Sequence, residues 1–100
     1  MKIRELSREA DVDVIEFYWI DDILHFLVIP YDGYEGVIAV TAERCKVTCP
    51  IIDNFIYKEY DYGGIVFVHE LASDGLIERM INHEPGANAE FLERVRRSGL

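Results

Sequence analysis

Basic residues are scarce in this sequence. Ten lysines and arginines stand against nineteen aspartates and glutamates, which gives a formal net charge of −9 over 100 residues. A surface of that charge repels a phosphate backbone, so we expect no direct nucleic-acid binding. It favours association with a basic protein partner, through electrostatic steering and complementarity.

Long hydrophobic runs are also missing. No apolar stretch approaches the roughly 18 residues that a membrane-spanning helix needs. Residues 1–6 carry no hydrophobic segment after their basic residues, as a secretory signal would. We therefore expect a cytoplasmic protein with no membrane partner, organised as a single domain over residues 1–100.

Cysteine occurs only at positions 45 and 49. In the alternating segment 44–51, Cys45 and Cys49 share one strand face with Val47 and Ile51. Their Cα atoms would lie about 13 Å apart on a strand, whereas a disulfide needs less than about 7 Å. Because CxxxC is not a typical zinc spacing either, we interpret both as core thiols and expect no metal and no cofactor.

Motifs for nucleophilic catalysis and phosphate binding are absent. None of the serines lies in a GxSxG elbow, and the glycines form neither GxGxxG nor GxxxxGK. We therefore expect no enzymatic activity and no catalytic residue. One alternative is a small metal- or ligand-binding, enzyme-like domain that uses His25, His69 and nearby carboxylates, if their strands pair.

The patterns that are present indicate an α+β fold. Runs of β-branched and aromatic residues predict an antiparallel sheet of about five or six strands, built from hairpins in a meander, and two C-terminal helices packed on one face. Residues 2–10 could form a short N-terminal helix, and Asn88 is a suitable cap for the last helix. The predicted strands cover residues 12–20, 23–29, 37–41, 44–51, 55–60 and 65–71.

Two loops combine tyrosine, acid and glycine. They hold five of the six tyrosines. Tyrosine offers a large, rigid contact surface with a polar tip, and a neighbouring carboxylate can pair with arginine or lysine of a partner. We predict a partner-binding surface at these residues: Tyr31, Asp32, Tyr34, Glu35, Tyr57, Glu59, Tyr60, Asp61 and Tyr62.

These features together predict a non-enzymatic, acidic protein-binding module. In character, though not in aligned sequence, the chain resembles small acidic bacterial inhibitors, the immunity proteins and antitoxins that neutralise a basic nuclease toxin. A nuclease is basic because it holds nucleic acid, so an acidic inhibitor gains association rate and specificity. A further alternative is a homo-oligomer, such as a homodimer, that pairs through the tyrosine loops and exposed strand edges.

Overall fold

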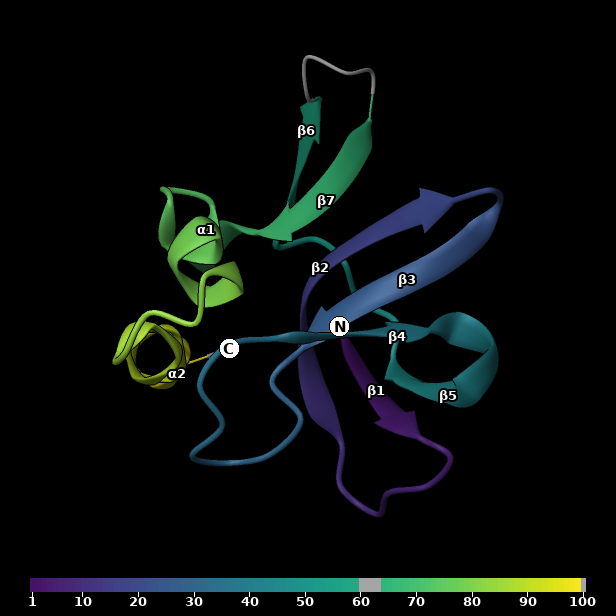
Figure 1. The fold of residues 1–100 in the computed structure, drawn as a ribbon, viewed down its shortest axis with the longest axis horizontal. Helices are drawn as coiled ribbons and strands as arrows, with labels where there is room; N and C mark the ends of the chain where they lie inside the picture. Colours follow the sequence, from purple (N-terminus) through teal and green to yellow (C-terminus); the bar gives the residue numbers. More distant parts are fainter. Residues whose placement is uncertain (60–63, 100) are drawn as a thin grey trace.

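A computed structural model describes residues 1–59 and 64–99 and shows an α+β fold, in which an antiparallel sheet of seven strands precedes two helices (Figure 1). The predicted fold class is confirmed, with more strands than the five or six expected. The elements are β1 (Lys2–Glu5), β2 (Val12–Ile20), β3 (Ile23–Val28), β4 (Ile38–Thr41), η1 (Ala42–Arg44), β5 (Cys45–Cys49), β6 (Phe55–Glu59), β7 (Ile65–His69), η2 (Glu70–Ala72), α1 (Leu76–Ile81) and α2 (Ala87–Ser98).

The predicted N-terminal helix is wrong, because residues 2–5 form strand β1. A helix would have placed Ile3, Leu6 and Ala10 on one buried face. Instead Ile3 is fully buried, whereas Leu6 is 74% exposed and Ala10 is exposed as well. Ile3 pairs with Val12 on one side and Val47 on the other, so its burial comes from sheet pairing.

Strand β2 organises the sheet. One edge pairs with β3, and the other is shared by β1, at residues 12–13, and β7, at residues 16–18. Two hairpins therefore extend beyond the shared region, β2–β3 and β6–β7 (Figure 1).

Among the described residues, no helix is long and apolar enough to cross a membrane.

The register of β2 shifts at a β-bulge between Val14 and Glu16. Side chains of a regular strand alternate between faces, and one extra residue changes that phase. Val14 and Phe17, three positions apart, therefore belong to one core, while Ile15 belongs to the other. Glu16 faces the same side as Ile15, since its register partners Leu27 and Val68 lie in the Ile15 core.

The first core lies where the sheet curls. Strand β4 continues through η1 into β5, which pairs with β1, so the ends of the strand order β4-β3-β2-β1-β5 are joined by one short turn. The buried side chains enclosed there are Ile3, Val14, Phe17, Phe26, Val28 and Val40.

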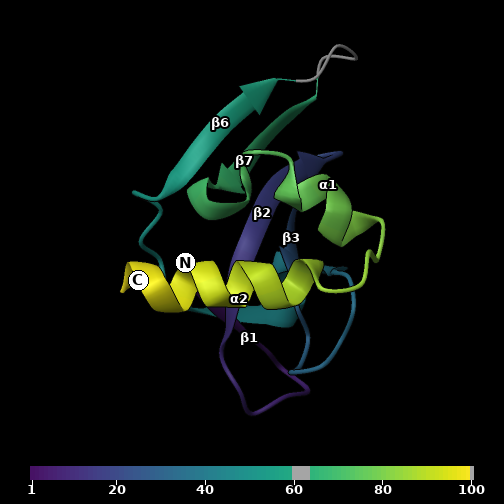
Figure 2. The same cartoon turned by 90° about the vertical axis from the view of Figure 1, so that its left-hand side faces the viewer.

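The second core lies beneath the helices, which cover one side of β2 and β7 (Figure 2). Leu76, Ile77 and Met80 of α1 and Phe91 of α2 are buried against the sheet, as their helical spacing requires. The predicted cap at Asn88 is wrong, because α2 begins at Ala87 after an N-cap at Gly86. Asn88 is instead buried within the first turn of α2.

The predicted burial of one face of the segment 44–51 is only partly correct. Cys45 and Cys49 are free thiols and half-buried, but Val47 is 42% exposed and Ile51 is 59% exposed. Among the described strands, β5 pairs only with the four-residue β1 and lies at the edge of the sheet, so little of the sheet covers it. Burial raises the pKa of the Cys45 thiol, with a smaller contribution from the charge of Glu5.

Candidate functional site

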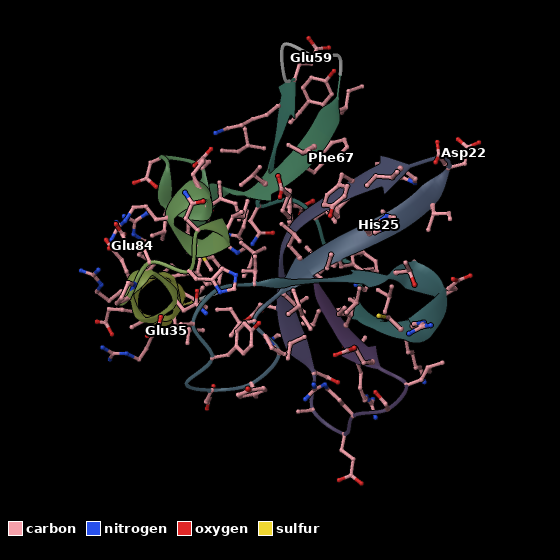
Figure 3. The ribbon with its side chains drawn as sticks, in the orientation of Figure 1. Asp22, His25, Glu35, Glu59, Phe67 and Glu84 are labelled. Atoms are coloured by element: carbon pink, nitrogen blue, oxygen red, sulfur yellow. The ribbon has the colours of Figure 1, made fainter. Side chains whose placement is uncertain are left out.

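The described residues of the two predicted tyrosine-acid segments lie at opposite ends of the molecule, residues 31–35 in a loop and Tyr57 and Glu59 in β6. Figure 3 shows Glu35 beside the helices and Glu59 at the far tip of the β6–β7 hairpin. The structure therefore does not bring the predicted residues together into one surface. Tyr60, Asp61 and Tyr62 lie outside the described residues.

The loop at residues 31–36 is fastened to the helices. The side-chain amide of Asn88 donates to the carbonyl oxygens of Tyr34 at 2.6 Å and of Gly36 at 2.7 Å. Gly36 has a φ of +107°, and a Cβ added there would lie 2.6 Å from Nδ1 of His83. Both the backbone conformation and the close approach of the imidazole require glycine.

Tyr31 is the exposed tyrosine of this loop. The Tyr31 ring packs edge to face against the Tyr34 ring, with 5.3 Å between their centroids. The guanidinium carbon of Arg8 lies 5.9 Å from the centroid of the Tyr31 ring. Tyr31 and Asp32 line a cavity of about 670 Å³ that reaches to α2. Asp32 and Glu35 are both exposed. This loop is thus partly a structural element that connects the sheet to the helices.

The other end carries a group of exposed and half-buried aromatic and apolar side chains on the sheet face that α1 and α2 leave uncovered. We call it the aromatic patch and define it as Trp19, Tyr57, Ile65 and Phe67. The Phe67 ring lies 6.2 Å from Trp19 and 5.7 Å from Tyr57, between centroids. It also stacks on the buried Phe17 at 4.8 Å, which connects the patch to the core.

The aromatic patch is exposed despite its size and composition. Trp19 and Tyr57 are each 51% exposed, and Ile65 is 45% exposed. Isolated apolar side chains are normal on a protein surface, but a contiguous exposed set rimmed by polar groups is typical of an interaction site. Tryptophan and tyrosine are also the residues that contribute most often to binding energy at protein interfaces.

Carboxylates lie at the tips of both hairpins beside the patch. Asp21 and Asp22 form the β2–β3 turn, and Glu59 ends β6; Figure 3 shows Asp22 and Glu59 at the outer ends of the two strand pairs. The Tyr57 hydroxyl donates to Oε1 of Glu59 at 2.6 Å, which raises the pKa of the phenol. Within the described part of the chain, none of these three carboxylates forms an ion pair with lysine or arginine.

The Asp21-Asp22 turn has an unfavourable backbone conformation. Both residues have positive φ, 50° and 66°, as a two-residue type I′ hairpin requires. Asparagine and glycine are the usual residues there, because a side chain in the left-handed region is disfavoured. The turn therefore keeps two carboxylates where stability alone would favour Asn-Gly.

The arginines of α2, by contrast, are neutralised within the fold. Arg94 bonds Asp74 at 2.9 Å and Glu90 at 3.0 Å. Arg96 pairs with Glu93, and Arg97 contacts the same carboxylate at 3.6 Å. The basic C-terminal segment therefore offers little positive charge, while the acids beside the aromatic patch stay uncompensated.

The histidines of the alternative hypothesis lie on different strands, with β2 between them. His25 stacks on Tyr18 at 5.4 Å, and its Nδ1 bonds the carbonyl of Ile23 at 2.9 Å. His69 is buried, and its Nδ1 accepts the Leu71 N–H at 3.1 Å. The described residues contain no group of three or more His, Cys, Asp or Glu side chains that could hold a metal ion.

Sequence reasoning missed Trp19 and Phe67, which it assigned only to strands. The available signal was position, since Trp19 stands two residues before the Asp21-Asp22 turn, near the end of a strand. A strand end that no helix covers is exposed on both faces. Which strand ends the helices cover depends on the three-dimensional packing and cannot be read from the sequence.

Comparisons of the chain with protein-family models, with curated proteins and with solved structures found no match. The geometry and charge of the surface itself are therefore the basis on which a function can be assigned.

Proposed function

We propose that the chain is a non-enzymatic binding protein whose aromatic patch, flanked by Asp21, Asp22 and Glu59, docks onto a basic surface of another protein. The observation that carries the proposal is the contiguous ring cluster of the exposed Trp19 and Tyr57 with the half-buried Phe67, beside carboxylates that form no ion pair with a described lysine or arginine. The class of function is that of an inhibitor or immunity-type protein that neutralises a basic partner, such as a nuclease toxin.

The aromatic rings would supply most of the affinity. Trp19 and Tyr57 are supported from beneath by Phe67 and Phe17, so little conformational entropy remains to be lost on binding. Burying such rings in a partner contributes both apolar area and a polar tip for hydrogen bonding. Removal of one central aromatic anchor at an interface commonly weakens binding by about 2 kcal/mol or more.

The carboxylates would supply association rate and partner choice. A chain with a net charge of −9 attracts a basic protein over a distance comparable to the Debye length. Near contact, Asp21 and Asp22 would pair with arginine or lysine at the rim of the interface. Because rim charges are screened by salt, binding should weaken as ionic strength increases.

The first test is affinity capture from a lysate of the source organism at about 50 mM and about 500 mM salt, followed by purification of the retained protein. The supporting result is a basic protein that binds one-to-one in calorimetry, with affinity that falls as salt rises. Dissociation constants are then measured for Trp19→Ala and Tyr57→Ala, which we expect to be about 30-fold weaker, the equivalent of about 2 kcal/mol.

Tyr31→Ala is the matched control, because Tyr31 is 56% exposed but lies in the loop at the other end of the molecule. It should bind within about twofold of the unsubstituted chain. Asp22→Asn should weaken binding at low salt, because it removes a carboxylate beside the aromatic patch. Asp53→Asn removes another exposed carboxylate and is the control for it. If Tyr31→Ala weakens binding while Trp19→Ala and Tyr57→Ala do not, the partner occupies the 31–36 loop and the proposed surface is wrong.

A further inference from the structure

A separate cavity lies on the helix-covered side of the sheet, the face opposite the aromatic patch. It measures about 410 Å³ and is bounded by strands of the sheet and by the last residue of α1. A volume of this order is typical of small-molecule pockets. Its apolar walls are Leu27, Val37, Ala39, Val66 and Ile81.

One carboxylate lies in this apolar cavity. Glu16 lines the pocket although it is only 4% exposed. The bulge after Val14 turns it to this face, between its register partners Leu27 and Val68. Bulges often re-aim a side chain beside a functional site.

The carboxylate of Glu16 has no direct partner in the described part of the chain, where it forms neither a hydrogen bond nor an ion pair. Lys58, whose charge acts on Glu16, donates its ammonium hydrogen to the carbonyl oxygen of Ser73 at 2.6 Å instead. Buried charges in proteins are normally paired, because an unpaired one loses its hydration without compensation. An unpaired buried carboxylate that lines an open cavity is therefore available to pair with a charged group of a ligand.

The charged groups around the cavity favour a cation. The pKa of Glu16 is raised from the ordinary 4.5 to about 7, chiefly by burial and next by the charge of Glu78 on α1, while the charge of Lys58 on β6 lowers it to a smaller extent. Tyr18 lies beside Glu16 in the pocket and stacks on His25 of β3. The nearby charged groups thus make the electrostatic potential negative at the position that a ligand's charged group would occupy.

We propose that this pocket binds a small organic cation, an ammonium or guanidinium group on an apolar stem, with Glu16 as its counter-ion. The walls would bury the stem, and the carboxylate would accept charge-assisted hydrogen bonds from the cation. An anionic ligand would be repelled by Glu16 and Glu78, and a neutral apolar one would leave the carboxylate unpaired. This site does not depend on the proposed protein-binding function, because it lies on the opposite face of the sheet.

The test is a titration of the ¹⁵N-labelled chain followed by amide chemical shifts at pH 8 and pH 5.5. The probes are benzylamine, the capped amino acid Nα-acetyl-lysine methylamide, and benzyl alcohol as the neutral match of benzylamine. Benzylamine, which stays protonated at both pH values, should shift amides of β2, of Val37 to Ala39 and of the end of α1. Its affinity should fall roughly 30-fold from pH 8 to pH 5.5, because Glu16 must lose a proton to pair with it.

Glu16→Gln should weaken benzylamine binding at least 10-fold and remove its pH dependence. Glu78→Gln, a neighbouring exposed carboxylate, is the matched control and should change the affinity less than threefold. Tighter binding of benzylamine than of the capped lysine assigns the site to a free amine, and the reverse order to a lysine side chain of a protein; either supports a cation site.

The proposal is overturned if neither amine binds, or if benzyl alcohol binds as tightly as benzylamine. Equal losses in Glu16→Gln and Glu78→Gln would also overturn it, because they would indicate unspecific attraction to an acidic surface. If Glu16→Gln does not fold, Ala39→Leu, which narrows the pocket from β4, provides the second variant and should abolish the shifts. The pH dependence of the unsubstituted chain decides the question without any variant.

Discussion

Glu16→Gln should change how the stability of the chain depends on pH. The carboxyl of Glu16 has a pKa of about 7 in the fold, against an ordinary value of 4.5, chiefly because it is buried. Each pKa unit corresponds to about 1.4 kcal/mol, so complete burial would give about 3.4 kcal/mol. The cavity admits solvent next to the carboxylate, and we therefore expect about 2 kcal/mol.

The sign follows from proton binding. Between pH 4.5 and 7 the folded chain keeps a proton on Glu16 that the unfolded chain has released, so stability falls as pH rises through this window. Above about pH 7 both states are ionised at this position and the loss is complete. Glutamine does not titrate, so the advantage of Glu16→Gln over the unsubstituted chain should grow by about 1.5 kcal/mol from pH 5 to pH 8, where about three quarters of the effect falls.

Urea unfolding of both chains at pH 5, 6, 7 and 8 measures this difference. His69 titrates in the same range with the opposite sign, since burial lowers its pKa and the unfolded chain binds a proton that the folded chain does not. That contribution is common to both chains and cancels in the difference. A gap that stays constant across the series would refute the burial of an unpaired Glu16, and with it the electrostatic basis of the cation pocket.

Three further changes test the remaining geometry. Gly36→Ala should destabilise the chain by about 2 kcal/mol in urea unfolding, because the new Cβ would stand at a residue with positive φ and clash with the His83 ring. An unchanged midpoint would contradict the close packing of the 31–36 loop against His83. Asn88→Ala should cost about 2 kcal/mol by the same assay, since it leaves the carbonyls of Tyr34 and Gly36 without their donor; a loss below 0.5 kcal/mol would show that water replaces it. Asp22→Gly should raise stability by about 0.5 to 1 kcal/mol while it slows partner association in stopped-flow measurements; a loss of stability would argue against a type I′ turn.

The fold class could be predicted from the sequence because each element carries a clear local pattern. The helical spacing of Leu76, Ile77 and Met80 matches the buried face of α1. The acidic pair Asp21-Asp22 separates two strands, and the structure places a hairpin turn there. Local periodicity is sufficient where burial follows one face of one element.

The candidate site could not be predicted in the same way, because it depends on strand order. Tyr31 and Tyr57 belong to segments of similar composition. Tyr31 lies in a loop beside the helices, whereas Tyr57 lies in β6, at the other end of the molecule. Asn88 has the composition of a helix cap, but its amide is used to fasten a loop more than fifty residues earlier in the chain. Contacts of that kind follow from packing and have no local signature.

The bulge in β2 is the feature that links both candidate sites. In the run Val14-Ile15-Glu16-Phe17 all four residues are buried, so simple alternation assigns no face to any of them. The register shift places Glu16 in the cavity beneath the helices and leaves Phe17 beneath the aromatic patch. Without the extra residue, Phe17 could not share a face with Val14, and either the core or the patch would lose its aromatic support. One irregularity in a single strand thus explains why an acid is buried on one face of the sheet while an aromatic cluster reaches the surface on the other.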